Sequence, residues 1–340
     1  MRAIGYYAPQ AITAETSLVD LDLPMPTAQG RDLLVEVKAV SVNPVDTKVR
    51  KGQQPEAGQP RILGYDAAGI VKAVGEGVSL FKPGDEVYYA GAINRSGTNA
   101  EFHLVDERIV GRKPASLGFA QAAALPLTTI TAFEALFHRL NITAPVAGAL
   151  PAVLITGGAG GVGSIAIQLV KQLTDLTVIA TASRPETADW AHALGADHVI
   201  DHSKPLAGEY AALGIAAPAF IFSVTHSVQH RLDLAEIIAP QGRLAIIDDF
   251  ADDFSIMAFK RKAVSIHWEM MFARPMFETV DMIEQHALLN QVADLIDAGL
   301  IRTTLDTVLG PINAETLKKA HALVESGRMR GKVVLEGFTG

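Results

Sequence analysis

Glycines at fixed spacing follow an apolar, β-prone run in the middle of the chain. Residues 152–163 read AVLITGGAGGVG, in which Gly158, Gly160 and Gly163 form G-x-G-x-x-G. The first glycine of this pattern permits a tight turn, the second lets the backbone approach a pyrophosphate, and the third allows close helix–strand packing. A helix that begins here offers free N–H groups and a partial positive charge to phosphates. The alternative is a glycine-rich turn without a ligand. The spacing predicts a dinucleotide-binding turn whose other members are Ala159, Gly161 and Val162.

The residues after the next predicted strand bear on the choice between NADH and NADPH. A site that prefers NAD usually has an acidic residue about 20 positions past the glycines, where it holds the ribose 2′-hydroxyl. Here the strand 177–181 is followed by Ala182, Ser183 and Arg184. A carboxylate would repel a 2′-phosphate, whereas a guanidinium group can bind one through two hydrogen bonds. We therefore predict NADPH as the cofactor, with Ser183 and Arg184 as contacts; in the alternative, Ser183 begins a capping box.

Alternating strands and helices position these residues. From Pro151 onward, candidate strands alternate with helical segments, as in a doubly wound parallel sheet. The candidate strands are 153–156, 177–181, 198–200, 220–224, 243–247 and 264–267. Helices are predicted at 186–194, 277–298 and 314–325, and a final strand at 332–336. This alternation predicts an α/β fold for the second part of the chain.

The first part of the chain is β-rich in pattern. Residues 33–40 (LLVEVKAV) alternate apolar and polar side chains, and turns are marked by Asn43-Pro44 and by the phrase KPGD at 82–85. Short strands with such turns predict a compact, barrel-like β unit. A helical region at 119–140, interrupted by Pro126, follows it.

Composition limits the class of protein. A chain of 340 residues suggests about two domains. The net charge of −8 disfavours nucleic acid or an anionic membrane surface as a general partner. The chain has no cysteine, which excludes disulfides, thiol nucleophiles and Cys-ligated zinc. Neither a signal peptide nor a membrane span is evident, so we expect a cytoplasmic protein.

Six phrases along the chain carry a family resemblance. They are GYDAAGIVKAVGEGV (64–78), FKPGDEV (81–87), AALPLTTITAFEAL (123–136), GGAGGVG (157–163), LGADHVID (194–201) and GKVVLE (331–336). In them the chain resembles the medium-chain dehydrogenase/reductase superfamily over essentially its whole length, and within it the zinc-free, zeta-crystallin-like quinone oxidoreductases. The resemblance implies a GroES-like catalytic domain at 1–126 and 273–340, a Rossmann nucleotide-binding domain at 127–272, and a homodimer.

The chain departs from the zinc-dependent members of that superfamily. They place a cysteine shortly after the strand that corresponds to 33–40 and a histidine in a G-H-E phrase; here these regions read SVNPVD (41–46) and Gly64-Tyr65-Asp66. His226 and His230 have the i,i+4 spacing of a helical metal pair, but no third ligand is evident, so a surface pair is the simpler interpretation. We expect no metal. Because alcohol oxidation without a Lewis acid has a high barrier, we predict hydride transfer to a quinone or an α,β-unsaturated carbonyl.

The resemblance also assigns residues to the site. It places Asn43, Asp46 and Lys48 by the active-site cleft, where Lys48 could donate to a substrate carbonyl and Asp46 could orient it; the family often has tyrosine in place of Lys48. Tyr65 supplies a phenolic donor. Four further residues are implied to contact the cofactor: Thr129, His202, Phe272 and Lys332.

Each assignment has a structural alternative. Asn43-Pro44 could be a turn that leaves Asp46 and Lys48 in solvent. Tyr65 and Phe272 could pack in the core, and Thr129 could cap a helix. For the whole chain, two alternatives to a quinone or enone reductase stay open: a nicotinamide-binding sensor or structural protein, and an alcohol dehydrogenase.

Overall fold

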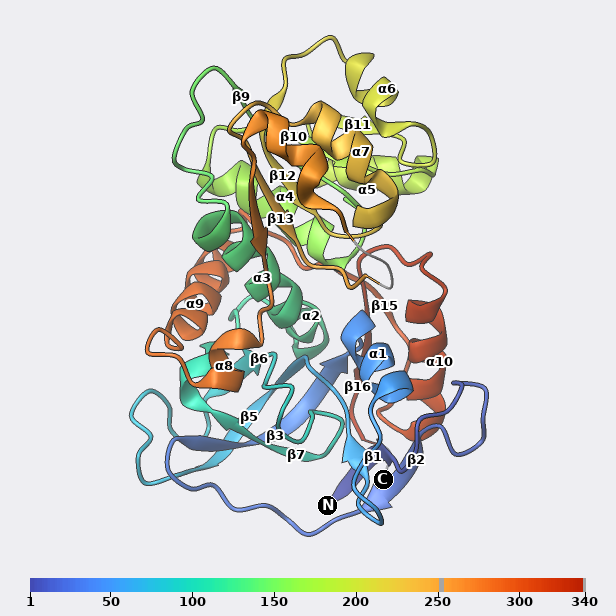
Figure 1. Ribbon diagram of the computed structural model, residues 1–340. Helices are drawn as coiled ribbons and strands as arrows, with labels where there is room; N and C mark the ends of the chain where they lie inside the picture. The colour runs from blue at the N-terminus through green and yellow to red at the C-terminus, as the bar shows by residue number, and fades with distance from the viewer. Residues whose placement is uncertain (251–253, 339–340) are drawn as a thin grey trace. The chain divides into compact units, whose positions relative to one another are not determined.

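The computed structural model describes residues 1–250 and 254–338. The chain divides into two compact units, of which the first comprises Met1–Ile130 and Phe272–Gly340 and the second Thr131–Met271. Both ends of the chain belong to the first unit, so the second unit is an insertion in its sequence (Figure 1).

A six-stranded sheet forms the centre of the second unit. Its strands run in the order β11-β10-β9-β12-β13-β14, and every pairing between neighbours is parallel. The strands are β9 (Leu150–Ile155), β10 (Thr177–Thr181), β11 (His198–Ile200), β12 (Pro218–Ser223), β13 (Arg243–Ile246) and β14 (Ser265–Trp268). This order is that of the doubly wound dinucleotide-binding fold, with the sheet growing outward in both directions from β9. The predicted Rossmann fold is confirmed.

Helices make the crossovers that parallel strands require. They are α4 (Gly161–Leu173), α5 (Pro185–Ala193), α6 (Leu206–Ala211), α7 (Ser227–Ile237) and the 3₁₀ helix η3 (Ile256–Lys262). Along α4, Ile165 and Leu169 are fully buried, one helical turn apart. After α5 and Leu194, Gly195 adopts φ +109°, a conformation that residues with a side chain rarely take.

The first unit is built on two sheets. A three-stranded sheet has the order β2-β1-β4, and a larger sheet has the order β15-β16-β3-β5-β6-β8, with β7 also paired to β3. The strands are β1 (Arg2–Tyr6), β2 (Val19–Asp22), β3 (Asp32–Ser41), β4 (Arg61–Ile62), β5 (Ala67–Val74), β6 (Glu86–Tyr89), β7 (Phe102–Asp106), β8 (Val110–Arg112), β15 (Leu305–Val308) and β16 (Lys332–Glu336). Strand β16 pairs antiparallel with β3, Val334 opposite Ser41, so the end of the chain completes the sheet that its first part begins.

The helix predicted at 277–298 is wrong over its first third, where the chain forms a turn. The prediction ran from 277 to 298, whereas α8 (Ala273–Phe277) ends before Glu278 and α9 (Glu284–Asp297) begins later. Glu278 adopts φ +44°, which breaks the helical path. Asp281 accepts hydrogen bonds from Thr279 Oγ1 and Arg274 Nη2, which hold the chain in a turn. These local bonds outweigh the apolar periodicity on which the prediction rested.

The remaining helices include an unusual one. In the first unit lie α1 (Pro44–Gly52), η1 (Glu107–Ile109), α2 (Phe119–Ala123) and α10 (Ala314–Glu325). Helix α3 (Pro126–Phe133) continues into a π-helical turn, η2 (Glu134–Arg139). By length and composition, Phe119–Arg139 could cross a membrane, but 89% of its most apolar window is buried in the protein, as in core helices.

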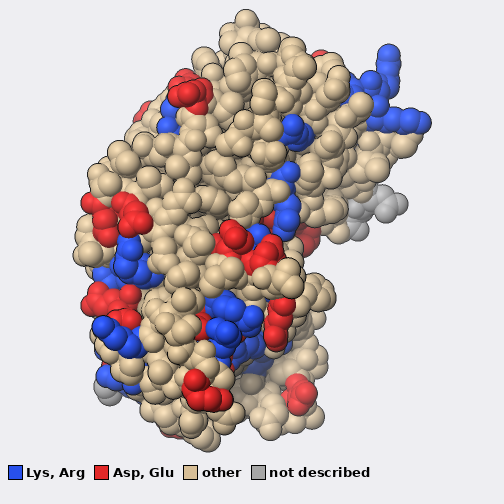
Figure 2. Space-filling view, turned by 90° about the vertical axis from the view of Figure 1, so that its left-hand side faces the viewer, with Lys and Arg blue, Asp and Glu red and all other residues tan. Residues whose placement is uncertain are grey.

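Charges are mixed on the surface. In the face that Figure 2 presents, Lys and Arg side chains lie interspersed with Asp and Glu. A continuous basic stripe of the kind that follows a phosphate backbone does not run across that face.

Two carboxyl groups meet inside the second unit. Glu269, which follows β14, is 5% exposed and lies close enough to the Glu134 carboxyl, which comes from the π-helical turn, for the two to interact electrostatically. Arg139 Nε donates to Glu269 Oε2 at 2.9 Å. Two buried carboxylates repel each other, and protonation of one of them relieves this repulsion. Burial, followed by the neighbouring Glu134 charge, raises the pKa of Glu269 to about 8.

This pair predicts a stability that falls with rising pH. The pKa of this carboxyl is higher in the folded chain than its ordinary value of 4.5, so the folded chain holds the proton more tightly than the unfolded chain does. The free energy of unfolding therefore falls as pH rises from 4.5 to about 8. The loss is at most ~1.4 kcal/mol per pH unit. Glutamine at position 269 can still accept a hydrogen bond from Arg139. We expect Glu269→Gln to make the thermal melting temperature depend less on pH over that range. Glu236→Gln, an exposed change in the same unit, should leave the slope unchanged. Equal slopes in all three proteins would contradict the raised pKa of Glu269.

Candidate functional site

The glycine turn joins β9 to α4. Gly157 adopts φ +64° and donates from its N–H to Thr181 Oγ1 at 3.0 Å, while Gly158 N donates to the Thr181 carbonyl oxygen at 2.9 Å. Helix α4 begins after Gly160 and has no side-chain cap, so the N–H groups of its first turn have no acceptor from a capping side chain. Such a helix start binds anions.

The three glycines of the motif differ in what surrounds them. A Cβ on Gly163 would lie 2.3 Å from the Gly157 carbonyl oxygen, and one on Gly158 would lie 2.7 Å from Ala180 Cβ. At these two positions the surrounding protein therefore leaves no room for a side chain. A Cβ on Gly160 would meet nothing closer than the Gly157 carbonyl oxygen at 3.4 Å. The open side of Gly160 suits the close approach of a ligand such as a pyrophosphate.

The end of β10 supplies polar groups beside this turn. Thr181 Oγ1, which accepts from Gly157 N, also lies 2.9 Å from His202 Nδ1. Arg184, rather than Ser183, is the residue that precedes α5, and its N–H donates to Thr187 Oγ1 at 3.3 Å. The Arg184 side chain is partly exposed and donates from Nε to Glu186 at 2.6 Å. The predicted contacts Ser183, Arg184 and His202 thus all follow the C-terminal ends of neighbouring strands, where α/β sheets bind ligands.

A buried ion pair stands at the centre of the polar residues in the first unit. Lys332 Nζ, at the start of β16, donates to Asp66 Oδ2 at 3.0 Å, to Asn43 Oδ1 and to the Val42 carbonyl oxygen. The Lys332 and Asp66 side chains are 4% and 0% exposed. Asn43 Nδ2 also donates to Asp66 Oδ2, at 2.7 Å. Every donor and acceptor of the pair is thus engaged, as a buried charge requires.

The second oxygen of Asp66 reaches another element. Asp66 Oδ1 accepts from the N–H of Leu127, in the first turn of α3, at 2.7 Å. A carboxylate at a helix start is favoured by the free N–H groups and the dipole there. Burial still raises the pKa of Asp66 above its ordinary value, although Lys332, Asn43 and the Leu127 N–H all act to lower it.

Asp46 binds backbone rather than side chains. Its two carboxylate oxygens accept from Asn43 N at 2.8 Å and from Gly64 N at 2.9 Å. These bonds fix the start of α1 against the loop that precedes Tyr65. Burial raises the pKa of Asp46 to about 7, against the opposing effect of these N–H donors and of Lys332.

Tyr65 carries a buried hydroxyl with no hydrogen-bond partner among the described residues. Its ring is 0% exposed and packs edge-on against Phe272, with centroids 5.3 Å apart. Burial raises the pKa of Tyr65 to about 12, so the phenol keeps its proton at neutral pH. The hydroxyl of Thr129 is likewise buried without such a partner in the described part of the chain. Because an unsatisfied buried hydroxyl is costly, both are candidates for binding a ligand.

The predicted residues of the first unit therefore separate into groups. Asn43 and Lys332 meet in one cluster, together with Asp66, which the sequence reasoning did not select. Tyr65 and Phe272 form a second, aromatic contact. Lys48 is exposed on α1, whereas Asp46 on the same helix is buried. Asp66 could have been suspected because a charged residue stands beside an apolar strand, but only the structure identifies its partner.

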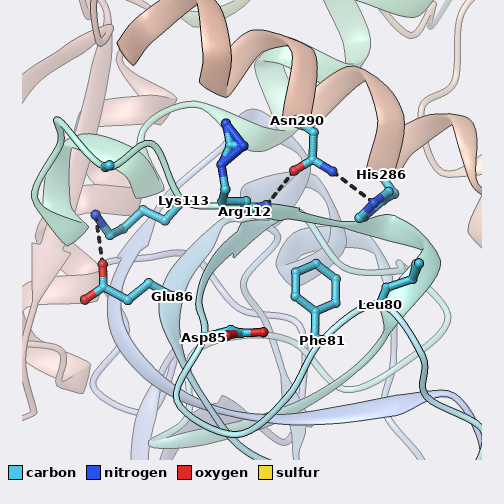
Figure 3. A pocket seen from close by; sticks show the side chains of 9 residues that line it. Leu80, Phe81, Asp85, Glu86, Arg112, Lys113, His286 and Asn290 are labelled. Atoms are coloured by element: carbon cyan, nitrogen blue, oxygen red, sulfur yellow. Dashed lines mark hydrogen bonds and ion pairs between the residues drawn. The ribbon is translucent and has the colours of Figure 1, made fainter.

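A shallow groove of about 610 Å³ lies elsewhere in the first unit. In Figure 3, Asn290 lies between Arg112 and His286; its Oδ1 accepts from Arg112 N at 2.9 Å, and its Nδ2 lies 2.9 Å from His286 Nε2. Lys113 is paired with Glu86 at 3.1 Å. None of the predicted site residues lines this groove.

Two family models match the chain. Residues 29–132 match the alcohol dehydrogenase GroES-like domain, and residues 194–335 match the zinc-binding dehydrogenase model. Among the described residues, however, no group of three or more His, Asp or Glu side chains is placed to hold a metal ion.

Several known proteins are similar to this chain, over its whole length or over part of it. A zinc-type alcohol dehydrogenase-like protein of Staphylococcus aureus is 40% identical over 98% of this chain and 99% of its own length. A crystal structure from Rhizobium etli, of a protein classed with the zinc-dependent alcohol dehydrogenases, is 65% identical, with a TM-score of 0.98 over 100% of this chain and 99% of that one. The chloroplastic NADPH-dependent alkenal/one oxidoreductase of Arabidopsis thaliana is 36% identical over 55% of this chain and 49% of its own.

Removing the ammonium group tests the role of the buried ion pair. We expect Lys332→Met to lower the free energy of unfolding by about 3–5 kcal/mol, because Asp66 would be left buried without its cation. Urea unfolding followed by circular dichroism measures this loss. Adding Asp66→Asn should recover part of it. Lys319→Met, which removes an exposed pair with Glu315, should cost under about 0.5 kcal/mol. Equal losses for the two lysine variants would contradict a central role for Lys332.

Proposed function

Because the chain belongs to the medium-chain dehydrogenase/reductase superfamily of oxidoreductases, we propose that it transfers hydride from NADPH to a quinone or an α,β-unsaturated carbonyl compound, without zinc. The observation that carries the proposal is the buried cluster of Lys332, Asp66 and Asn43. This cluster decides whether the site can bind a zinc ion, and the presence or absence of zinc limits the class of substrate that the protein can reduce.

The residues of this cluster do not fit a zinc ion. Zinc in such enzymes takes three or four good nitrogen, sulfur or oxygen ligands. The chain has no cysteine, and Tyr65 follows Gly64 where zinc members have histidine. The Asp66 and Asn43 oxygens that could ligate already accept hydrogen bonds from the Lys332 ammonium group. An internal cation thus already neutralises these oxygens, and we derive no step through zinc.

Without a Lewis acid, the substrate must be a ready hydride acceptor. Quinones and α,β-unsaturated carbonyls accept hydride when a hydrogen-bond donor stabilises the charge that develops on their oxygen. The Tyr65 hydroxyl, buried and without a partner among the described residues, is the donor that we assign to this oxygen. Its raised pKa keeps the proton in place for donation. The similar Arabidopsis protein is an alkenal/one oxidoreductase, which supports this substrate class.

Residues of the second unit support the proposed use of NADPH. When bound, the nicotinamide supplies the hydride. The turn at Gly157–Gly160 and the uncapped start of α4 suit the pyrophosphate, with Ala159, Gly161, Val162 and Gly163 completing the turn. Ser183, Arg184 and His202 follow the strand ends where a 2′-phosphate would lie. In the first unit, the Thr129 hydroxyl, which has no hydrogen-bond partner among the described residues, suits the carboxamide of the nicotinamide.

We also propose a homodimer. Strand β14 is an edge of the six-stranded sheet, and its last residue, Trp268, is 57% exposed. An unpaired edge with an exposed aromatic side chain suits pairing with a second copy of the chain.

Tyr65→Phe separates chemistry from folding, because the lost hydroxyl has no partner among the described residues. With NADPH and a panel of quinones and α,β-unsaturated carbonyls, we expect wild-type turnover and a fall in kcat of about 10²-fold for the variant. Its melting temperature should be unchanged or slightly higher.

Tyr88→Phe is the matched control for this experiment. The Tyr88 hydroxyl donates to the Leu289 carbonyl oxygen at 2.6 Å, so its loss should lower stability and leave kcat nearly unchanged. If no acceptor on the panel is reduced, a sensor or structural role gains support. If added zinc restores oxidation of alcohols, the proposal is wrong and the chain is an alcohol dehydrogenase.

Arg184→Ala tests the choice of cofactor. Loss of a charge-assisted contact to the 2′-phosphate should weaken NADPH binding about 10- to 100-fold and leave NADH within about twofold. Fluorescence titration measures both dissociation constants. Glu186→Gln, which removes the charge that competes for Arg184, should not weaken NADPH binding. Equal weakening of NADPH and NADH by Arg184→Ala would exclude a role at the 2′-phosphate.

A further inference from the structure

Arg61 carries a half-buried guanidinium group that has few partners in the chain. Its Nη2 donates to the Ile93 carbonyl oxygen at 2.8 Å, whereas its Nε is buried and has no hydrogen-bond partner among the described residues. No ion pair joins Arg61 to a carboxylate in the part of the chain that the structure describes. A cation that is partly removed from water is costly unless an anion accompanies it.

The Arg61 guanidinium group lies close to the hydroxyl of Tyr65. Burial is the main cause of the raised pKa of Tyr65, about 12, and the neighbouring Arg61 is the strongest influence in the opposite direction. The charge of Asp46 also acts on Tyr65, but the two Asp46 oxygens accept from the N–H groups of Asn43 and Gly64. A cation and a phenolic hydroxyl are therefore neighbours, and each has a polar atom without a partner among the described residues.

The backbone between Arg61 and Tyr65 is fixed by hydrogen bonds. The carbonyl oxygens of residues 62–64 accept from the N–H groups of residues 97–99 at distances between 2.9 and 3.1 Å. In a straight strand, side chains four positions apart would be separated by about 13 Å. Gly64 adopts φ +110°, which bends the chain and allows the two side chains to approach each other. The fold thus holds a cation and a hydroxyl at a set spacing, which suits a substrate with two polar groups.

We propose that Arg61 binds a carboxylate of the substrate while Tyr65 binds the carbonyl oxygen, so that the preferred acceptors are α,β-unsaturated carbonyl compounds that carry an acidic group. The inference rests on the proposed function, which assigns Tyr65 to the substrate oxygen. A guanidinium group forms charge-assisted hydrogen bonds with carboxylates. The simplest acceptors of this class are 4-oxo-2-alkenoates, in which a ketone and a carboxylate flank one C=C bond. A neutral acceptor would leave Arg61 without its anion, so the site distinguishes the two kinds of substrate.

Reduction of such a substrate follows the proposed chemistry. Hydride from NADPH adds to the carbon β to the ketone, the π electrons of the C=C bond move to the ketone oxygen, and Tyr65 stabilises the resulting enolate. A proton from solvent then adds to the α carbon, which yields the saturated 4-oxo acid and NADP⁺. Arg61 holds the carboxylate throughout, so its contribution is to binding and orientation.

(E)-4-Oxo-2-pentenoate and its methyl ester are the acceptors that test this preference, because they share the reacting carbons and differ in charge. With NADPH, we expect the full chain to show a kcat/KM about 10- to 100-fold higher for the acid than for the ester. The ester is the more electrophilic alkene, so a preference for the acid has to come from the protein. Equal or lower kcat/KM for the acid in the wild-type protein would overturn the inference.

Two variants of Arg61 locate the preference. Arg61→Gln should lower kcat/KM for the acid about 10- to 100-fold more than for the ester, and Arg61→Lys, which keeps the charge, should retain part of the preference. Lys82→Gln removes an exposed cation from the same unit and is the matched control, so its acid-to-ester ratio should equal that of the wild type. An unchanged ratio in Arg61→Gln would overturn the inference. Should that variant fail to fold, as judged by circular dichroism, Arg61→Lys and the wild-type ratio decide.

Binding of 4-oxopentanoate, which has no C=C bond to reduce, separates this inference from the proposed function. By isothermal titration calorimetry in the presence of NADP⁺, we expect Arg61→Gln to bind it about tenfold more weakly than the wild type. If acid and ester are reduced equally well, the proposed function stands and the carboxylate site is overturned. If neither is reduced, the proposed function is wrong for these acceptors. In that case, weaker binding of 4-oxopentanoate by Arg61→Gln supports the carboxylate site, and equal binding overturns it.

Discussion

The Lys332 ammonium group is the charge on which the first unit depends. It bonds to Asn43 and Asp66, which lie 289 and 266 positions away in the chain. A buried cation is stable only when its partners are in place, because the cost of removing it from water exceeds what one contact returns. Strand β16, the start of α1, the strand β5 that follows Asp66 and the start of α3 must therefore meet at one point. The end of the chain is in this way required for its first part to fold.

The same interaction limits the chemistry. With Asp66 and Asn43 both engaged by Lys332, the buried polar atoms left without partners among the described residues include the hydroxyls of Tyr65 and Thr129 and the Nε of Arg61. Hydroxyls donate to a ligand oxygen but do not lower the pKa of an alcohol as a metal does. A neutralised cluster and a phenol without a partner among the described residues therefore agree with the proposed stabilisation of charge on a substrate oxygen rather than with formation of an alkoxide.

Sequence reasoning succeeded where local pattern decides the structure. The strands Thr177–Thr181, His198–Ile200 and Lys332–Glu336 begin and end where predicted, and the glycine turn lies between β9 and α4. It failed at 278–283, where a positive φ and the bonds of Asp281 interrupt a periodic apolar pattern. Nor could it pair Asp66 with Lys332, because nothing local marks residues so far apart as partners. The contact appears only once β16 pairs with β3.

The two units handle charge in opposite ways. In the first unit a buried cation is fully compensated by carboxylate, amide and carbonyl oxygens of the chain itself. In the second, the partly exposed Arg184 pairs with Glu186, and the N–H groups in the first turn of α4 have no acceptor from a capping side chain. A compensated buried charge holds a fold together, whereas an uncapped helix start favours an anionic ligand. Internal ion pairing thus fixes the cluster of the first unit, while the backbone of the second unit offers the partial positive charge that the proposed cofactor requires.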